Sequence, residues 1–392
     1  MTRIPIDALL GHREPAALRR LTLEAMAATR REERLERIRA ARPSAAAWLE
    51  YARTNLVAPV VAHALLDALD PGFDGEAECR RLHEASLRRM RTMLAELDLV
   101  AGRLARDGVR MVGLKNAGIA RGVFPCAGCC PMGDLDVLVD RARFRDAHKL
   151  ILESGFTLAA RGTVEQADLE HGLQSGGTEY VKQTGGEEVW FELQWRPIAG
   201  RWIRRDQEPD GAALLARSVP IPHTDVRLLA PEDNLLQVAL HTAKHTYVRA
   251  PGLRLHTDVD RLTAYAPPDW DRVVQAAQAL DVRTAVYFSL ACAEALLGTP
   301  IPDTALEALA PPAWKVAAIT RWLRAVDVFD PDGKKFTRPA MAVFTALLYD
   351  DAAGLVASAL DAEKRELTLS QMPRHLVRGV ARVKDLLTRY QD

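Results

Sequence analysis

Two aspartates separated by a single residue, Asp134 and Asp136, lie in the run GDLDVLVD. Apolar residues alternate with them at 135, 137 and 139, a pattern that predicts a β-strand with one buried face. Both carboxylates then lie on the same face, where they repel each other unless a cation lies between them. Paired carboxylates of this kind bind Mg²⁺, which clamps phosphate oxygens. The run therefore predicts a metal site, and the alternative is a solvated strand edge beside a turn.

A third carboxylate, Glu192, lies in the apolar run VWFELQW. Alternation along a strand places Phe191 and Leu193 on the face opposite to it. Glu192 is thus the candidate that completes a three-carboxylate site. The alternative is a surface carboxylate on an outer strand.

Phosphate needs positive charge and free N–H groups as well as a metal. The run MVGLK predicts a strand that leads into a helix at Asn116, and the first N–H groups of a helix attract phosphate. Lys115 adds a positive charge there. Gly133, beside the aspartates, and Arg204, in the basic run RWIRRD, are further candidates for nucleotide contact. Neither a Walker A pattern nor a G-x-G-x-x-G pattern is present.

The elements that must position these residues fall into three regions. Residues 1–108 predict a helical region, 109–228 a small α/β core, and 229–392 a second helical region that includes the last 40 or so residues. Within the core, strands are expected at 135–140 and in FTLAAR, and a hairpin is expected to turn at Gly185-Gly186. Asp140 is expected to cap the helix that follows its strand.

The amino-acid composition argues against several classes of protein. The chain has 392 residues, of which 48% are hydrophobic, and 52 Lys and Arg balance 52 Asp and Glu. This balance argues against disorder over most of the chain and against nucleic-acid binding by bulk charge. No stretch has the length and apolarity of a membrane span, and the N-terminus does not resemble a signal peptide. A cytoplasmic protein with reduced thiols is the expectation.

Cysteines and histidines are a second possible source of chemistry in this sequence. Cys126, Cys129 and Cys130 form the run CAGCC, which resembles half of a metal motif without its partner half, and we interpret them as loop thiols. His241 and His245 lie one helical turn apart. Together with His256 and Asp258 they raise the question of zinc, but HTAKH lacks the Glu of H-E-x-x-H.

We therefore favour packing of His241 and His245 against the α/β core or a place in the acceptor pocket. Asp258 and Asp260 are expected to cap a helix.

The combination GLKNAGIARGVFP…PMGDLDVLVD, followed by FELQW and HTAKH, resembles a bacterial family of nucleotidyltransferases within the DNA polymerase β-like superfamily. The resemblance covers about residues 95–265 and implies an α+β fold: a small mixed-sheet core flanked by helical regions. It also implies that Asp134 and Asp136 bind two metal ions and that Glu192 bridges one of them. The ions would be Mg²⁺ or Mn²⁺.

Three positions depart from the family pattern. Asn116 stands where a Gly is usual, Cys130 where an Arg commonly precedes Pro-Met-Gly-Asp, and Gln194 where a His is frequent. The first two bear on the phosphate loop and on triphosphate binding.

The leading interpretation is an enzyme that transfers a nucleoside monophosphate from an NTP, with ATP favoured, to an unidentified acceptor with release of pyrophosphate. The alternative is a non-catalytic protein on a decayed nucleotidyltransferase scaffold that binds a nucleotide or a partner. A weaker alternative is an RNA acceptor bound by the basic N-terminal helices.

Overall fold

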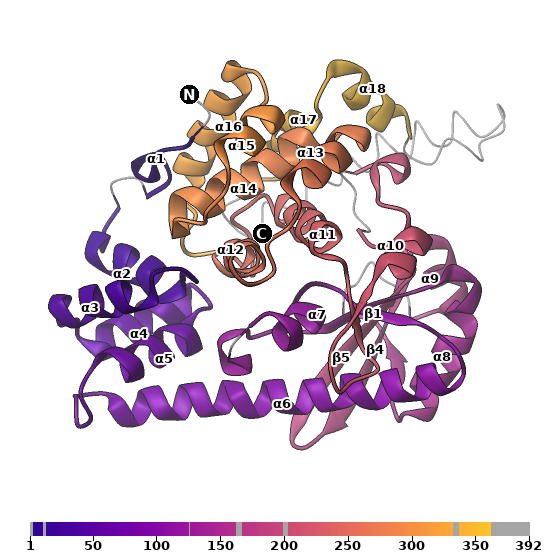
Figure 1. Ribbon diagram of the computed structural model, residues 1–392, viewed down its shortest axis with the longest axis horizontal. Coiled ribbons are helices and arrows are strands. Elements are labelled where there is room, and N and C mark those ends of the chain that lie inside the picture. Colours follow the sequence, from indigo (N-terminus) through magenta and orange to yellow (C-terminus); the bar gives the residue numbers. More distant parts are fainter. Residues whose placement is uncertain are drawn as a thin grey trace.

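The computed structural model describes residues 3–10, 13–124, 126–161, 167–198, 203–331 and 337–361. Helices precede and follow one mixed sheet along the chain (Figure 1). The predicted α+β class is therefore confirmed. No helix in these ranges is long and apolar enough to cross a membrane.

The sheet has seven strands in the order β3-β4-β5-β2-β1-β7-β6. Strand β2 lies at its centre, parallel to β5 and antiparallel to β1. The strands are β1 (Met111–Gly113), β2 (Leu135–Val139), β3 (Thr157–Ala159), β4 (Gly177–Thr184), β5 (Glu187–Gln194), β6 (Val219–Pro220) and β7 (Arg227–Leu228).

Local sequence explains the hairpin and the helix that follows β2. Strands β4 and β5 are joined at Gly185 and Gly186, whose φ angles of 57° and 78° belong to the left-handed region that a two-residue hairpin turn requires. The Asp140 carboxylate accepts a hydrogen bond of 2.8 Å from the Ala142 N–H, so this residue caps the helical segment as predicted.

The helical part before the sheet ends in one very long helix, α6. It runs along one side of the molecule, from the N-terminal helices to the sheet (Figure 1). The helices are α1 (Ile6–Leu10), α2 (Ala16–Met26), α3 (Arg31–Ala41), α4 (Ala45–Thr54), α5 (Ala58–Ala68) and α6 (Glu76–Arg106).

Helices also connect the strands and follow the sheet. The connecting segments are α7 (Lys115–Gly122), η1 (Ala127–Cys129), η2 (Arg141–Arg143), α8 (Phe144–Glu153), α9 (Leu169–Ser175), η3 (Arg205–Gln207) and α10 (Gly211–Arg217). The C-terminal helices are α11 (Pro231–Lys244), α12 (Arg254–Tyr265), α13 (Trp270–Ala279), α14 (Arg283–Leu297), α15 (Asp303–Leu309), α16 (Ala313–Val326), α17 (Arg338–Leu348) and α18 (Ala352–Asp361). The helix expected in the last 40 residues falls mostly at 362–392, outside the described residues.

The N-terminal and C-terminal helices share one apolar core with the sheet. Helix α1 packs against α16, at the opposite end of the sequence. Arg19 donates two hydrogen bonds to the Asp327 carboxylate, at 2.5 and 3.0 Å, and both side chains are buried. The three regions expected from the sequence therefore share one core. Their division into separate domains stays a prediction.

Candidate active site

Three carboxylates converge where β2 and β5 run side by side. Asp136 and Glu192 are register partners on these parallel strands, and Asp134 lies in the bend just before β2. Each residue offers an oxygen atom, and these atoms all lie within 4.8 Å of one another. The strand pattern singled out the same three residues, and their catalytic role stays a prediction.

Two donors already hold Asp136 in place. Lys115 Nζ donates a hydrogen bond of 2.6 Å to Asp136 Oδ1, and Gln194 Nε2 donates one of 2.8 Å to the same oxygen. Asp136 itself is only 3% exposed. Both Lys115, at the start of α7, and Gln194, at the end of β5, therefore belong to the site.

The ionisable groups of this cluster have pKa values that are shifted in different directions. Burial, with a further contribution from Asp136, raises the pKa of Glu192 to about 8. Burial also opposes ionisation of Asp136, but the Lys115 ammonium outweighs it and holds the pKa of Asp136 below its ordinary value. The three carboxylates together keep the pKa of Lys115 above its ordinary value, despite its burial. An all-oxygen donor set of three carboxylates fits a hard divalent cation such as Mg²⁺ or Mn²⁺.

An arginine and a fourth carboxylate complete the cluster, and sequence reasoning missed both. Arg161 Nη2 lies 2.6 Å from Asp134 Oδ2 and 2.5 Å from Glu179 Oε1. Glu179 is the register partner of Glu192 across the β4–β5 hairpin. The predicted hairpin was enough to identify Glu179. Glu179 lies as far before the Gly185-Gly186 turn as Glu192 lies after it, so the two residues pair across the hairpin. No spacing signal pointed to Arg161.

Two glycines bring α7 close to the end of β1. A Cβ on Gly118 would lie 2.4 Å from the carbonyl oxygen of Gly113, and a Cβ on Gly113 would lie 2.9 Å from Gly118. This close crossing places the first residue of α7, Lys115, over the carboxylates. The strand-to-helix turn predicted from the sequence is therefore present beside them.

The Asn116 side chain points to other partners. Its Nδ2 donates to Cys130 Sγ at 3.2 Å and to Asp258 Oδ1 at 3.0 Å. Two of the departures from the family pattern, Asn116 and Cys130, thus contact each other. Gly133 lies in the bend before Asp134, and a Cβ there would meet nothing within 4 Å. Nucleotide contact by Asn116 and Gly133 stays a prediction.

A second arginine, Arg254, was also missed. It is the first residue of α12, and its Nη1 donates to the carbonyl of Pro131, in the loop that leads to Asp134. Burial lowers the pKa of Arg254, and Asp258 and Asp134 oppose this effect by their charges. A guanidinium therefore lies against the loop in which Cys130 replaces the arginine of the family pattern.

The capping role expected for Asp258 and Asp260 is wrong. Helix α12 begins at Arg254, so both residues lie inside it, and both are buried. Asp258 accepts the bond from Asn116, while Asp260 Oδ2 accepts a hydrogen bond of 2.6 Å from the Ala28 N–H. They connect elements that are distant in the sequence.

Arg204 makes its contacts elsewhere. Its Nε lies 3.0 Å from Asp206 Oδ1, and its Nη1 donates to the carbonyl of Gly354, just inside α18, at 3.1 Å. These contacts add nothing in favour of nucleotide binding by Arg204, which stays a prediction.

A small cavity of about 10 Å³ adjoins the carboxylates and is lined by Lys115, Glu192, Gln194, Pro197, Ile198, Gln237, His241 and Lys244. Gln237 Oε1 and His241 Nδ1 are buried and have no hydrogen-bond partner within the described part of the chain. Burial lowers the pKa of His241 well below its ordinary value, so its imidazole is neutral. Helix α11 thus presents two neutral polar side chains and the Lys244 ammonium to the cavity beside the carboxylates.

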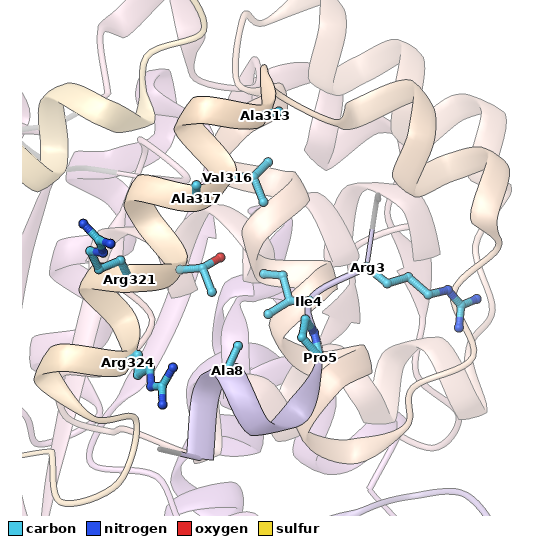
Figure 2. Close-up of a pocket in the computed structure, with 10 residues that line it drawn as sticks. Arg3, Ile4, Pro5, Ala8, Ala313, Val316, Ala317, Arg321 and Arg324 are labelled. Carbon is cyan, nitrogen blue, oxygen red and sulfur yellow. The ribbon is translucent and has the colours of Figure 1, made fainter. Parts of the chain in front are cut away.

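A wider cavity than this one lies away from the carboxylates. A cavity of about 540 Å³ between α1 and α16 is lined mainly by apolar side chains, with Arg3 and Arg321 at its edges (Figure 2). No carboxylate lines this cavity, so we do not place the metal-binding site there.

Comparison with known proteins bears on this site. Residues 44–298 match a family described as "Uncharacterised nucleotidyltransferase". The match covers more than half of the chain, including Asp134, Asp136 and Glu192. No curated protein and no solved structure matched the chain.

Proposed function

The chain belongs to this family of uncharacterised nucleotidyltransferases, and on that premise we propose that it transfers a nucleoside monophosphate from an NTP to an acceptor. An acceptor oxygen or nitrogen forms a bond to the α-phosphorus, and the bond from that phosphorus to the bridging oxygen breaks. Pyrophosphate leaves, and the acceptor loses one proton. ATP is the expected donor.

The observation that supports this proposal most strongly is the convergence of Asp134, Asp136 and Glu192 within 4.8 Å. These carboxylates would hold Mg²⁺ or Mn²⁺, which neutralises charge on phosphate oxygens when bound. Such a cluster has a direct use in phosphoryl transfer, where positioning and charge neutralisation lower the barrier.

Other residues divide the remaining tasks. Lys115, bonded to Asp136, and Arg254, bonded to the Pro131 carbonyl, supply positive charge near Asp134, where a triphosphate needs it. Arg161 orients Asp134 by its hydrogen bond. Gln237 and His241 line the cavity beside Glu192 and form the side on which we expect the acceptor.

The test is transfer of label from α-labelled NTP, together with pyrophosphate release, for each of the four ribonucleoside triphosphates. Cell extract serves as the source of acceptor, with Mg²⁺ or Mn²⁺ present. The Asp134→Asn/Asp136→Asn double variant should lose both signals. Asp140→Asn is the matched control, because Asn also caps helices and position 140 lies outside the cluster. Equal activity in the double variant and the wild type would reject the proposal.

Two observations favour a second candidate, a non-catalytic nucleotide-binding protein on the same scaffold. The side chains of Asn116 and Cys130 bond to each other, and the cavity at the carboxylates is only about 10 Å³. This candidate predicts Mg·ATP binding by titration calorimetry without pyrophosphate release. Label transfer by the wild-type protein would exclude it.

A further inference from the structure

A second cluster of metal-ligand residues lies apart from the carboxylates, between α5, α6 and η1. His63 comes from α5, His83 from α6, and Cys126 and Cys129 from the turn formed by η1. One ligand atom from each of the four residues lies within 4.8 Å of the other three. In the sequence, CAGC resembles half of a metal-binding motif. In the structure, the imidazoles of His63 and His83 supply the missing two ligands.

From this juxtaposition we infer that the protein carries a structural zinc site built from Cys126, Cys129, His63 and His83. Two cysteines separated by two residues, combined with two histidines, form one of the common closed tetrahedral zinc sites. Zinc bonds of about 2.3 Å to sulfur and about 2.0 Å to nitrogen place ligand atoms roughly 3.3–3.8 Å apart. His83 Nε2 and Cys126 Sγ are already 3.3 Å apart.

The surroundings of the cluster match those of a ligand set. A Cβ on Gly128 would lie 3.0 Å from His83 Nε2, so the glycine between the two cysteines leaves room for the imidazole. Ser86 Oγ, one turn after His83, donates a hydrogen bond of 2.8 Å to the carbonyl of Gly128 and fixes the turn against α6.

His63 also has an outer partner of the kind that zinc ligands usually have. His63 Nδ1 lies 3.4 Å from Asp67 Oδ2, which leaves Nε2 of the same ring for the metal. A carboxylate behind a ligating histidine sets the tautomer and the ring orientation. Arg31 in turn pairs with Asp67.

The thiols are suited to the same role. Cysteine binds zinc as the thiolate, so zinc would replace the proton of each thiol. A disulfide would use the two sulfurs but would leave the convergence of two imidazoles on them unexplained.

Such a site would hold the loop that leads into the carboxylate cluster. Cys129 is followed directly by Cys130, whose sulfur accepts the hydrogen bond from Asn116, and Asp134 comes four residues later. Zinc would fasten this loop to α5 and α6 and would not touch the substrate. The inference does not depend on the proposed transferase activity.

The first experiment is metal analysis of full-length protein purified without chelators and under reducing conditions. We expect about one zinc ion per chain, released when a mercurial reagent blocks the thiols. Protein produced with Co²⁺ should show thiolate-to-cobalt charge-transfer bands and the d–d bands of a tetrahedral site. Both readouts use the wild-type chain, so they do not depend on whether a variant folds.

Variants then locate the metal. Cys126→Ala, Cys129→Ala and His83→Asn should lose the zinc, and Gly128→Ala should hold it more weakly because its Cβ crowds His83. Cys79→Ala, which removes a thiol from the same α6 helix, and Asp134→Asn, in the carboxylate cluster, should keep it.

Three results would overturn the inference. The first is protein without zinc that also gives no cobalt bands. The second is zinc that stays in the Cys126 and Cys129 variants but leaves with Asp134→Asn. The third is a Cys126–Cys129 disulfide, found by mass spectrometry, in protein kept under reducing conditions.

Discussion

The two clusters, one of carboxylates and one of thiols and imidazoles, lie almost next to each other in the chain but offer different atoms to a metal. Only residues 130–133 separate Cys129 from Asp134. The cluster on the sheet offers oxygen alone and contains a lysine that pairs with one carboxylate. The cluster between the helices offers two sulfurs and two imidazoles.

With both proposed sites occupied, one loop would serve two metals with different tasks. Oxygen ligands favour Mg²⁺ or Mn²⁺, which exchange readily and accompany a nucleotide. Sulfur and nitrogen ligands favour zinc, which stays bound and stabilises the fold. The two clusters should therefore respond independently to mutation, to chelation and to pH.

The largest expected effect is a loss of transfer activity without a loss of zinc. Asp136→Asn should lower nucleotidyl transfer by about 10³-fold, because it removes a charge at the reacting phosphate. The zinc content measured in the same preparation should stay at that of the wild type. Loss of zinc from this variant would mean that the two clusters are coupled.

Metal removal gives the next largest effect. Stripping the protein with EDTA should abolish transfer and lower Tm by about 5–10 °C, as expected when a structural metal is lost. Mg²⁺ alone should restore only part of the activity, and Zn²⁺ followed by Mg²⁺ should restore both activity and Tm. Full recovery of Tm with Mg²⁺ alone would contradict the distinction between the clusters.

The pH dependence of Mg²⁺ binding should reflect Glu192. Its pKa is raised to about 8, so below that pH the metal must displace a proton. The apparent Mg²⁺ affinity should then fall by up to about tenfold for each pH unit below 8 and level off above it. Calorimetric titration of wild type and Glu192→Gln across this range checks the assignment. A flat profile in the wild type would rule it out.

The smallest effect compares two arginines. Arg254→Lys keeps the charge but loses the fork that contacts the Asp134 loop, so KM for the NTP should rise about fivefold. Arg204→Lys should change KM by less than about twofold, because Arg204 contacts Asp206 and Gly354. Steady-state kinetics of the two variants decides between the arginines, and a larger effect at Arg204 would restore its predicted role in nucleotide binding.

Much of the core could be predicted because its signals are local. Alternation with period two placed Asp134 and Asp136 on one strand face and set Glu192 apart from Phe191. The Gly185-Gly186 turn defined the hairpin, and Asp140 capped the segment after β2. Asp258 and Asp260 were misjudged because a polar residue inside a buried helix has the same local appearance as a cap. Their partners, Asn116 and Ala28, lie far away in the sequence.

The residue types identify which side chains can bind a metal or a phosphate. Alternation along the chain also predicts that Asp134 and Asp136 share one face, because side-chain direction in a strand depends only on position. The tertiary structure alone decided which distant side chains complete each cluster. Arg161 and Arg254 reach the Asp134 loop, and His63 and His83 reach Cys126, through the packing of whole helices and strands. Packing buries apolar faces from segments tens of residues apart, and no periodicity within one segment records which other segment it will meet.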